Sequence, residues 1–186
     1  MRRDLQKIRK FATTSHGQQW RKFADEPYIN HPIRVMEICQ RYTNNESILA
    51  AALLHDVLED TEIGKDELHE FLYTVFDKEI ANQTLRYVEE LTDVYLKSRY
   101  PQWNRRKRKS MEAQRLRKAS ADAQTIKYAD IIDNSLDLKN AEPDFAKLYL
   151  HECNALLKDM IDGNSELHKL AIATVEECLH VIKRRI

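Results

Sequence analysis

The chain has 186 residues, of which 42% are hydrophobic and 32% are charged, and this composition fits one soluble domain spanning residues 1–186. Lysine and arginine number 30, as do aspartate and glutamate, so the formal net charge is zero and attraction to nucleic acid or to a membrane surface is not expected. Only 3 glycines and 4 prolines occur, and the abundance of helix-favouring residues predicts an all-α fold.

The first third of the sequence predicts three helices. Apolar residues at helical spacing mark a helix over about 5–14, followed by a polar connector over 17–28. Asn30 is a candidate cap for the next helix, and Pro32 is tolerated in its first turn. The run 46–58 is apolar enough to form one central, largely buried helix.

Six further helices are predicted downstream of a break at Gly64, and Pro101 argues for a loop over 92–104. The helix rich in arginine and lysine after that loop is expected to be a solvated face rather than a nucleic-acid site, because acidic residues lie near it. In chain order the six helices cover about residues 65–72, 77–91, 105–118, 123–138, 143–162 and 167–182.

The three cysteines, Cys39, Cys153 and Cys178, lie far apart in helix-like, partly apolar segments. We expect them to be free thiols of a reducing compartment. No apolar run approaches the length of a membrane span, and residues 1–5 lack the apolar core of a signal peptide. A cytoplasmic protein is therefore expected.

One segment concentrates polar chemistry at the end of the apolar run 48–54. His55, Asp56, Glu59 and Asp60 follow it within about one and a half turns, and on a continuous helix they share one face of roughly 140°. Crowding these groups onto one face is costly unless something binds there. A divalent metal ion and a phosphate ester would offset that cost.

Imidazole and carboxylate side chains together suit divalent ions such as Mn²⁺, Fe²⁺ or Zn²⁺. His31 opens one predicted helix, His55 and Asp56 lie near the end of another, and Asp130 lies in a third. An adjacent His-Asp pair alone is weak evidence. Ligands from three helices must converge through the tertiary fold, as they do in helix-bundle metal sites.

The order of these residues is similar to the HD-superfamily metal signature. More narrowly, the chain resembles the free-standing hydrolase domain of RelA/SpoT proteins, the small alarmone hydrolases, over about residues 5–140. The matching segments are His16-Gly17-Gln18-Gln19, Pro27-Tyr28-Ile29-Asn30-His31-Pro32, residues 51–61, Thr92-Asp93, and Lys127-Tyr128-Ala129-Asp130 through Asn134.

The resemblance implies an HD-domain helical bundle with one Mn²⁺ per chain between its helices. The implied reaction removes pyrophosphate from the 3′ position of guanosine tetraphosphate or pentaphosphate (ppGpp, pppGpp). The implied metal ligands are His31, His55, Asp56 and Asp130. Glu59 and Asp60 are the implied catalytic carboxylates, and either can take a proton from the attacking water or orient it.

Four further residues are candidate contacts to the nucleotide. Arg21 and Lys22 match the basic pair with which the family grips its substrate, although a charged loop is the alternative. Asn134 lies four residues after Asp130, on the same helical face, and can hold a ribose or phosphate or make a local polar contact. Tyr149 can stack on the nucleotide or be a core tyrosine.

The sequence departs from the family pattern at Trp20, Asp133 and Leu136, where relatives have other residues. A lost cation beside an added carboxylate is expected to weaken the grip on a highly phosphorylated ligand. An adenosine alarmone or the 2′-phosphate of NADPH is therefore an alternative substrate, and a non-catalytic nucleotide sensor is a third possibility. His16 is expected to hydrogen-bond and pack rather than to bind metal. Oligomeric state is left open.

Overall fold

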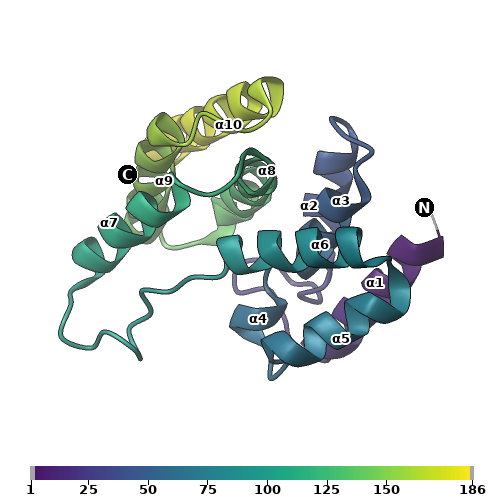
Figure 1. The fold of residues 1–186 in the computed structure, drawn as a ribbon. Coiled ribbons are helices and arrows are strands. Elements are labelled where there is room, and N and C mark those ends of the chain that lie inside the picture. Colours follow the sequence, from purple (N-terminus) through teal and green to yellow (C-terminus); the bar gives the residue numbers. More distant parts are fainter. Residues whose placement is uncertain (1–2, 185–186) are drawn as a thin grey trace.

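The computed structural model describes residues 3–184, which form ten α-helices and one short 3-10 helix (Figure 1). In chain order these are α1 (Arg3–His16), α2 (Asn30–Gln40), α3 (Glu46–Leu54), α4 (Val57–Asp60), α5 (Lys65–Val75), α6 (Lys78–Leu91), α7 (Arg105–Leu116), α8 (Ala121–Asp137), η1 (Leu138–Asn140), α9 (Pro143–Asp159) and α10 (Ser165–Lys183). An isolated bridge between Trp20 and Pro27 is the only β pairing in this described range. The all-α prediction is confirmed.

Helices α3 and α8 carry the core of the fold. Every residue of α3 from Ser47 to Leu54 is buried, as expected for a helix that is apolar on all sides. Helix α3 packs against α1, α2 and α6, whereas α8 packs against α2 on one side and against α10 on the other. Figure 1 shows α8 between α10 and the group formed by α2, α3 and α6. The α2–α3–α8 junction therefore lies in the middle of the molecule.

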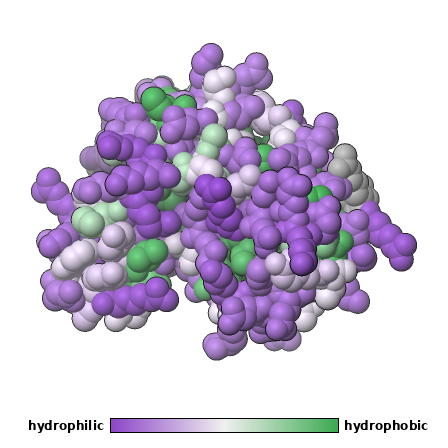
Figure 2. All heavy atoms as spheres, viewed as in Figure 1, coloured by the Kyte–Doolittle hydropathy of each residue, from purple (hydrophilic) through white to green (hydrophobic). Residues whose placement is uncertain are grey.

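The surface is predominantly polar, as the charged fraction of the sequence requires. The face drawn in Figure 2 is largely hydrophilic, with small and separated apolar patches. No helix in the described part of the chain has the length and apolar character needed to cross a membrane. The three cysteines are free, so the prediction of unpaired thiols is confirmed.

Polar side chains cap most of the helix beginnings, which explains why their positions were predictable. Asn45, Asp77, Asn104 and Ser120 each accept a backbone N–H from the first turn of the helix that follows. The predicted cap at Asn30 is wrong. Asn30 is already inside α2 and Ile29 holds the N-cap position, with no side-chain cap hydrogen bond. The side-chain amide of Asn30 instead donates to Glu26 Oε2 at 2.9 Å.

The prediction of one continuous helix over 46–58 is also wrong. Helix α3 ends at Leu54, and α4 begins at Val57 after a break at His55 and Asp56. His55 Nδ1 lies 2.8 Å from the carbonyl oxygen of Ala52, which a continuing helix would pair with the N–H of Asp56. The four polar residues of this segment therefore do not lie on one continuous helix: His55 follows α3, Asp56 precedes α4, and Glu59 and Asp60 belong to α4.

Two helix ends also differ from the sequence prediction. Helix α5 extends to Val75, and α9 ends at Asp159, before the predicted stop at Gly163. Gly163 lies in the connection between α9 and α10, pressed against α8: a Cβ atom there would lie 2.6 Å from Tyr128 Cε2 and 2.9 Å from the backbone nitrogen of Thr125. Close approach to α8, rather than helix termination, thus accounts for this glycine.

Substituting Gly163 with alanine is expected to lower the free energy of unfolding by about 1–3 kcal/mol, the usual range for overpacking. Urea denaturation followed by circular dichroism measures this change. Gly64→Ala is the matched control, because a Cβ at Gly64 meets nothing within 4 Å. Equal stability of the two variants would contradict the close contact to α8.

Candidate metal and catalytic site

The four predicted metal ligands lie together where α2, α3 and α8 meet. His31 Nε2 lies 3.5 Å from Asp56 Oδ2 and 3.1 Å from Asp130 Oδ1. His55 Nε2 lies 3.2 Å and 3.6 Å from the same two oxygens. The ligand atoms of His31, His55 and Asp56 lie within 4.8 Å of one another and could hold a metal ion. We refer to these four residues as the ligand cluster.

Both histidines turn their Nε2 atoms to the ligand cluster because their Nδ1 atoms are already bonded. His55 Nδ1 donates to the Ala52 carbonyl at 2.8 Å, and His31 Nδ1 donates to Asp133 Oδ2 at 2.7 Å. The Nε2 atom of His55 is buried and has no hydrogen-bond partner. An unpartnered imidazole nitrogen beside two carboxylate oxygens fits a divalent cation.

Opposite charges in the ligand cluster shift the pKa values of its members. Although burial opposes protonation, the neighbouring aspartates raise the pKa of His31 and that of His55. Although burial opposes ionisation, Lys127 and the two histidines hold the pKa of Asp130 well below its usual range. The ligand cluster therefore favours bound positive charge. A divalent ion would supply that charge and displace the protons from the two histidines.

Glu59 and Asp60 follow the ligand cluster on α4 and contact different groups. Glu59 Oε2 accepts the backbone N–H of Asp93 at 2.9 Å. The Tyr28 hydroxyl lies 2.7 Å from Asp60 Oδ2 and 2.7 Å from Asp56 Oδ2. Both carboxylates reach the surface. Even so, desolvation and the charge of Asp93 raise the pKa of Glu59 to about 7. Desolvation also raises the pKa of Asp60. A carboxylate with a pKa near neutrality suits general base catalysis.

Two of the predicted nucleotide contacts lie beside the ligand cluster and bond to each other. Arg21 Nη2 donates to Asn134 Oδ1 at 2.8 Å, and Asn134 Nδ2 donates to Asp130 Oδ1 at 2.5 Å. Arg21 also donates from Nε and Nη2 to Asp137 Oδ2, at 3.1 and 2.9 Å. A nucleotide would therefore compete with Asp137 for the guanidinium of Arg21.

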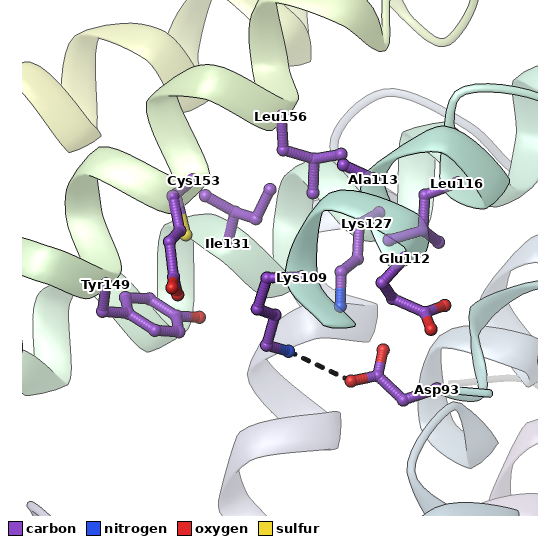
Figure 3. Close-up of a pocket in the computed structure, with 11 residues that line it drawn as sticks. Asp93, Lys109, Glu112, Ala113, Leu116, Lys127, Ile131, Tyr149, Cys153 and Leu156 are labelled. Carbon is purple, nitrogen blue, oxygen red and sulfur yellow. Dashed lines mark hydrogen bonds and ion pairs between the residues drawn. The ribbon is translucent and has the colours of Figure 1, made fainter. Parts of the chain in front are cut away.

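Of the other two predicted contacts, Tyr149 belongs to α9 and Lys22 lies beside that helix. Lys22 is exposed, with its Nζ 5.4 Å from the ring centroid of Phe145. Tyr149 lines a cavity of about 90 Å³ beside α7, α8 and α9, and its hydroxyl points into this cavity (Figure 3). Lys127 lines the same cavity and donates to Asp130 Oδ2 at 2.7 Å. The cavity thus adjoins the ligand cluster, and Lys127 makes an ion pair with one member of that cluster.

Several residues that organise the site were not predicted from the sequence. Tyr28 bridges two carboxylates, and Arg34 donates from Nε and Nη2 to Asp133 at 2.6 and 3.0 Å. Asp137 binds Arg21. Asp133 and Asp137 follow Asp130 by three and seven residues, so helical spacing from a predicted ligand was the signal that could have found them. Arg34 follows His31, another predicted ligand, by three residues on α2, so the same helical spacing could have found it.

The structure revises the interpretation of the three departures from the family pattern. The carboxylate of Asp133 is buried and engaged by His31 and Arg34, so it supports a predicted ligand. Leu136 lines a groove between α8 and α10 instead of the cavity beside the ligand cluster. Trp20 is exposed and pairs with Pro27 through the backbone. His16 behaves as predicted: its Nδ1 pairs with a glutamine and its ring stacks on a tyrosine.

Replacing Asp133 with asparagine is expected to weaken metal binding by about 10–100-fold, because the side chain that orients His31 loses its charge. Isothermal titration calorimetry with Mn²⁺ measures the effect. Asp137→Asn is the matched control, since Asp137 also lies near Arg34, at 3.6 Å, whereas the His31 Nδ1 partner in the described structure is Asp133. Equal affinities in the two variants would rule out this role for Asp133.

Comparisons with known proteins place these residues in a wider context. A family model described as HD domain matches residues 9–158. A Drosophila melanogaster protein named guanosine-3′,5′-bis(diphosphate) 3′-pyrophosphohydrolase MESH1 is 33% identical over 136 residues, covering 72% of this chain and 68% of that protein. The Homo sapiens protein of the same name is 35% identical over 137 residues, covering 72% and 69%.

Solved structures share the fold. A structure described as a metazoan ortholog of SpoT that hydrolyses ppGpp matches with a TM-score of 0.68 and 27% identity, covering 100% of this chain and 96% of that one. A Listeria monocytogenes protein matches with a TM-score of 0.59 and 22% identity, covering 84% and 99%. The second likeness concerns the fold alone.

Proposed function

The chain belongs to the HD domain family, and from that premise we propose that it hydrolyses guanosine 3′,5′-bis(diphosphate), and the pentaphosphate, to GDP or GTP and pyrophosphate. The observation that carries the proposal is the convergence of His31, His55, Asp56 and Asp130, with the carboxylates of Glu59 and Asp60 close by on α4. Relatives over most of the chain are named for this reaction. The free thiols favour a cytoplasmic location.

The metal would be one Mn²⁺ per chain, held by the ligand cluster. When bound, such an ion neutralises charge on phosphoryl oxygens and makes phosphorus more susceptible to attack. The mixed set of two imidazoles and two carboxylates suits Mn²⁺ and does not exclude Fe²⁺ or Zn²⁺. Activity of metal-stripped protein reconstituted with each ion ranks them, and the proposal expects Mn²⁺ to restore the highest rate.

The protein side chains would supply proton transfer and orientation. We propose that Glu59 takes a proton from the attacking water as the new bond to phosphorus forms and the bond from phosphorus to the 3′ oxygen breaks. The leaving oxygen gains a proton, so GDP and pyrophosphate account for every atom. Asp60, held by Tyr28 at 2.7 Å, would orient the water. Arg21 and Asn134 would contact the nucleotide, with Lys22 and Tyr149 at the α9 side.

The direct test is incubation of the purified protein with guanosine tetraphosphate and Mn²⁺. Anion-exchange chromatography and phosphorus NMR should show GDP and pyrophosphate in equal amounts. A chelator should stop the reaction, and added Mn²⁺ should restore it. Absence of turnover at saturating metal would refute the proposed function.

The contacts of Arg21 favour a second candidate substrate. Arg21 is engaged by Asp137, which lowers the positive charge available to a highly phosphorylated guanosine nucleotide. An adenosine alarmone or NADPH, losing its 2′-phosphate, is the alternative. Rates measured side by side on the three nucleotides decide between them. A pure nucleotide sensor is disfavoured, because a binder does not need the Glu59–Asp60 pair.

A further inference from the structure

We propose that Glu112, a buried carboxylate on α7, is a positioning residue that fixes the turn over 92–95 and thereby holds Glu59 in place. Glu112 belongs neither to the ligand cluster nor to the predicted catalytic pair. The inference rests on the proposed function in one respect, the catalytic role of Glu59.

The Glu112 carboxylate is fully engaged by the turn and by its own helix. Only 3% of Glu112 is exposed. Its Oε2 atom accepts the backbone N–H groups of Val94 and Tyr95, both at 3.0 Å, and its Oε1 atom pairs with Arg115. A buried charge is costly unless it is paired and hydrogen-bonded. Here Arg115 pairs with the charge and the turn supplies the hydrogen bonds.

Arg115 holds the carbonyl groups of the same segment. Its Nη1 donates to the Glu90 carbonyl at 2.7 Å, and its Nη2 donates to the Thr92 carbonyl at 3.0 Å. The pair Glu112–Arg115 thus binds two carbonyls and two amides within residues 90–95. These six residues end α6 and begin the loop to α7, where regular backbone bonding stops.

Asp93 lies between the bound groups and faces the catalytic side. Its N–H donates to Glu59 Oε2 at 2.9 Å, and its carboxylate accepts from Lys109 Nζ at 3.1 Å. Figure 3 shows Lys109 and Glu112 both directed toward Asp93. Lys109, Glu112 and Arg115 are spaced by three residues along α7, so one face of this helix holds the turn.

The Asp93 N–H restrains the Glu59 carboxylate through a hydrogen bond. Among the described residues, no other hydrogen bond or ion pair to that carboxylate is found. The position of the Asp93 N–H therefore helps to fix where Glu59 Oε2 lies. A shift of about 1 Å in a reacting group can lower the rate about a hundredfold. Replacing Glu112 should therefore slow the chemical step.

The kinetic test compares Glu112→Ala and Glu112→Gln with Gln114→Ala, an exposed position on the same helix. We expect Glu112→Ala to lower kcat by about 10–100-fold while KM and the Mn²⁺ dissociation constant stay unchanged. Glu112→Gln should recover part of the loss, because its amide oxygen still accepts the backbone N–H groups. Gln114→Ala should match the unmodified protein.

A double variant separates positioning from general damage. In a Glu59→Gln background, adding Glu112→Ala should produce no further loss of kcat, because the residue it positions is already disabled. Two losses that multiply would overturn the proposal, as would a fall in kcat that is matched by weaker Mn²⁺ binding.

Amide hydrogen exchange gives a readout that needs no substrate. In Glu112→Ala, exchange at Asp93, Val94 and Tyr95 should accelerate by about tenfold or more, and amides of α3 should be unaffected. Unchanged exchange at these three residues would overturn the proposal. Failure of the unmodified protein to hydrolyse guanosine tetraphosphate would instead refute the proposed function, and the exchange rates would still decide whether Glu112 holds the turn.

Discussion

Replacing Asp130 with asparagine is expected to lower kcat/KM for guanosine tetraphosphate by about a thousandfold or more, equivalent to about 4 kcal/mol of transition-state stabilisation. The substitution removes a charge from the ligand cluster, where Asp130 Oδ1 lies 3.1 Å from His31 Nε2 and 3.6 Å from His55 Nε2. Steady-state kinetics at several Mn²⁺ concentrations measures the loss, and calorimetry should show weaker Mn²⁺ binding.

The control for Asp130 is another aspartate on α8. Asp122 accepts a hydrogen bond from Tyr87 at 2.5 Å and is separated from Asp130 by two helical turns, so Asp122→Asn should leave both Mn²⁺ binding and turnover unchanged. Circular dichroism should confirm that both variants are folded. If Asp130→Asn kept more than a tenth of the activity at low Mn²⁺, the ligand cluster could not be the catalytic metal site.

The second large effect is expected at Glu59. Replacing Glu59 with glutamine should reduce kcat by about 10²–10⁴-fold, the range for loss of a general base, with little change in Mn²⁺ affinity. The glutamine can still accept the N–H of Asp93, so the turn over 92–95 should keep its place. Rapid-quench kinetics with saturating substrate measures the chemical step directly.

The pH profile gives an independent check on Glu59. Its pKa in the metal-free protein is raised to about 7, and a nearby cation lowers the pKa of a carboxyl, so the acidic limb of kcat should lie at or below pH 7. A base must be ionised, so kcat should fall as the pH drops through this limb, and the limb should vanish in Glu59→Gln. Glu62→Gln, an exposed neighbour, should retain both rate and profile.

Most helices were predictable because the signals for them are local. Asp77 and Asn104 cap helices with their own side chains, and the apolar stripe of α6 is buried as its period requires. The break at His55 and Asp56 was not predictable in this way. Local propensity favours one helix through this segment, and only the contacts of His55 with Ala52 and with other helices interrupt it.

The same distinction between local signals and tertiary contacts applies to the candidate site. The four ligands followed from residue type and order, whereas the roles of their partners required the tertiary structure. From the sequence alone, Asp133 was interpreted as an unfavourable added charge. Its partner Arg34, at 2.6 Å, is distant in sequence and comes from another helix. Glu112 gave no signal at all: it belongs to a helix whose composition indicates a solvated face, yet it is buried.

The Tyr28 hydroxyl lies between the predicted ligand Asp56 and the predicted catalytic carboxylate Asp60, 2.7 Å from an oxygen of each. It has a single hydrogen and can satisfy only one of the two oxygens at a time. A cation held by the Asp56 oxygen would make that oxygen a poorer acceptor and would favour donation to Asp60. Occupancy of the ligand cluster and the hydrogen bonding of Asp60 would then be linked through one hydroxyl group.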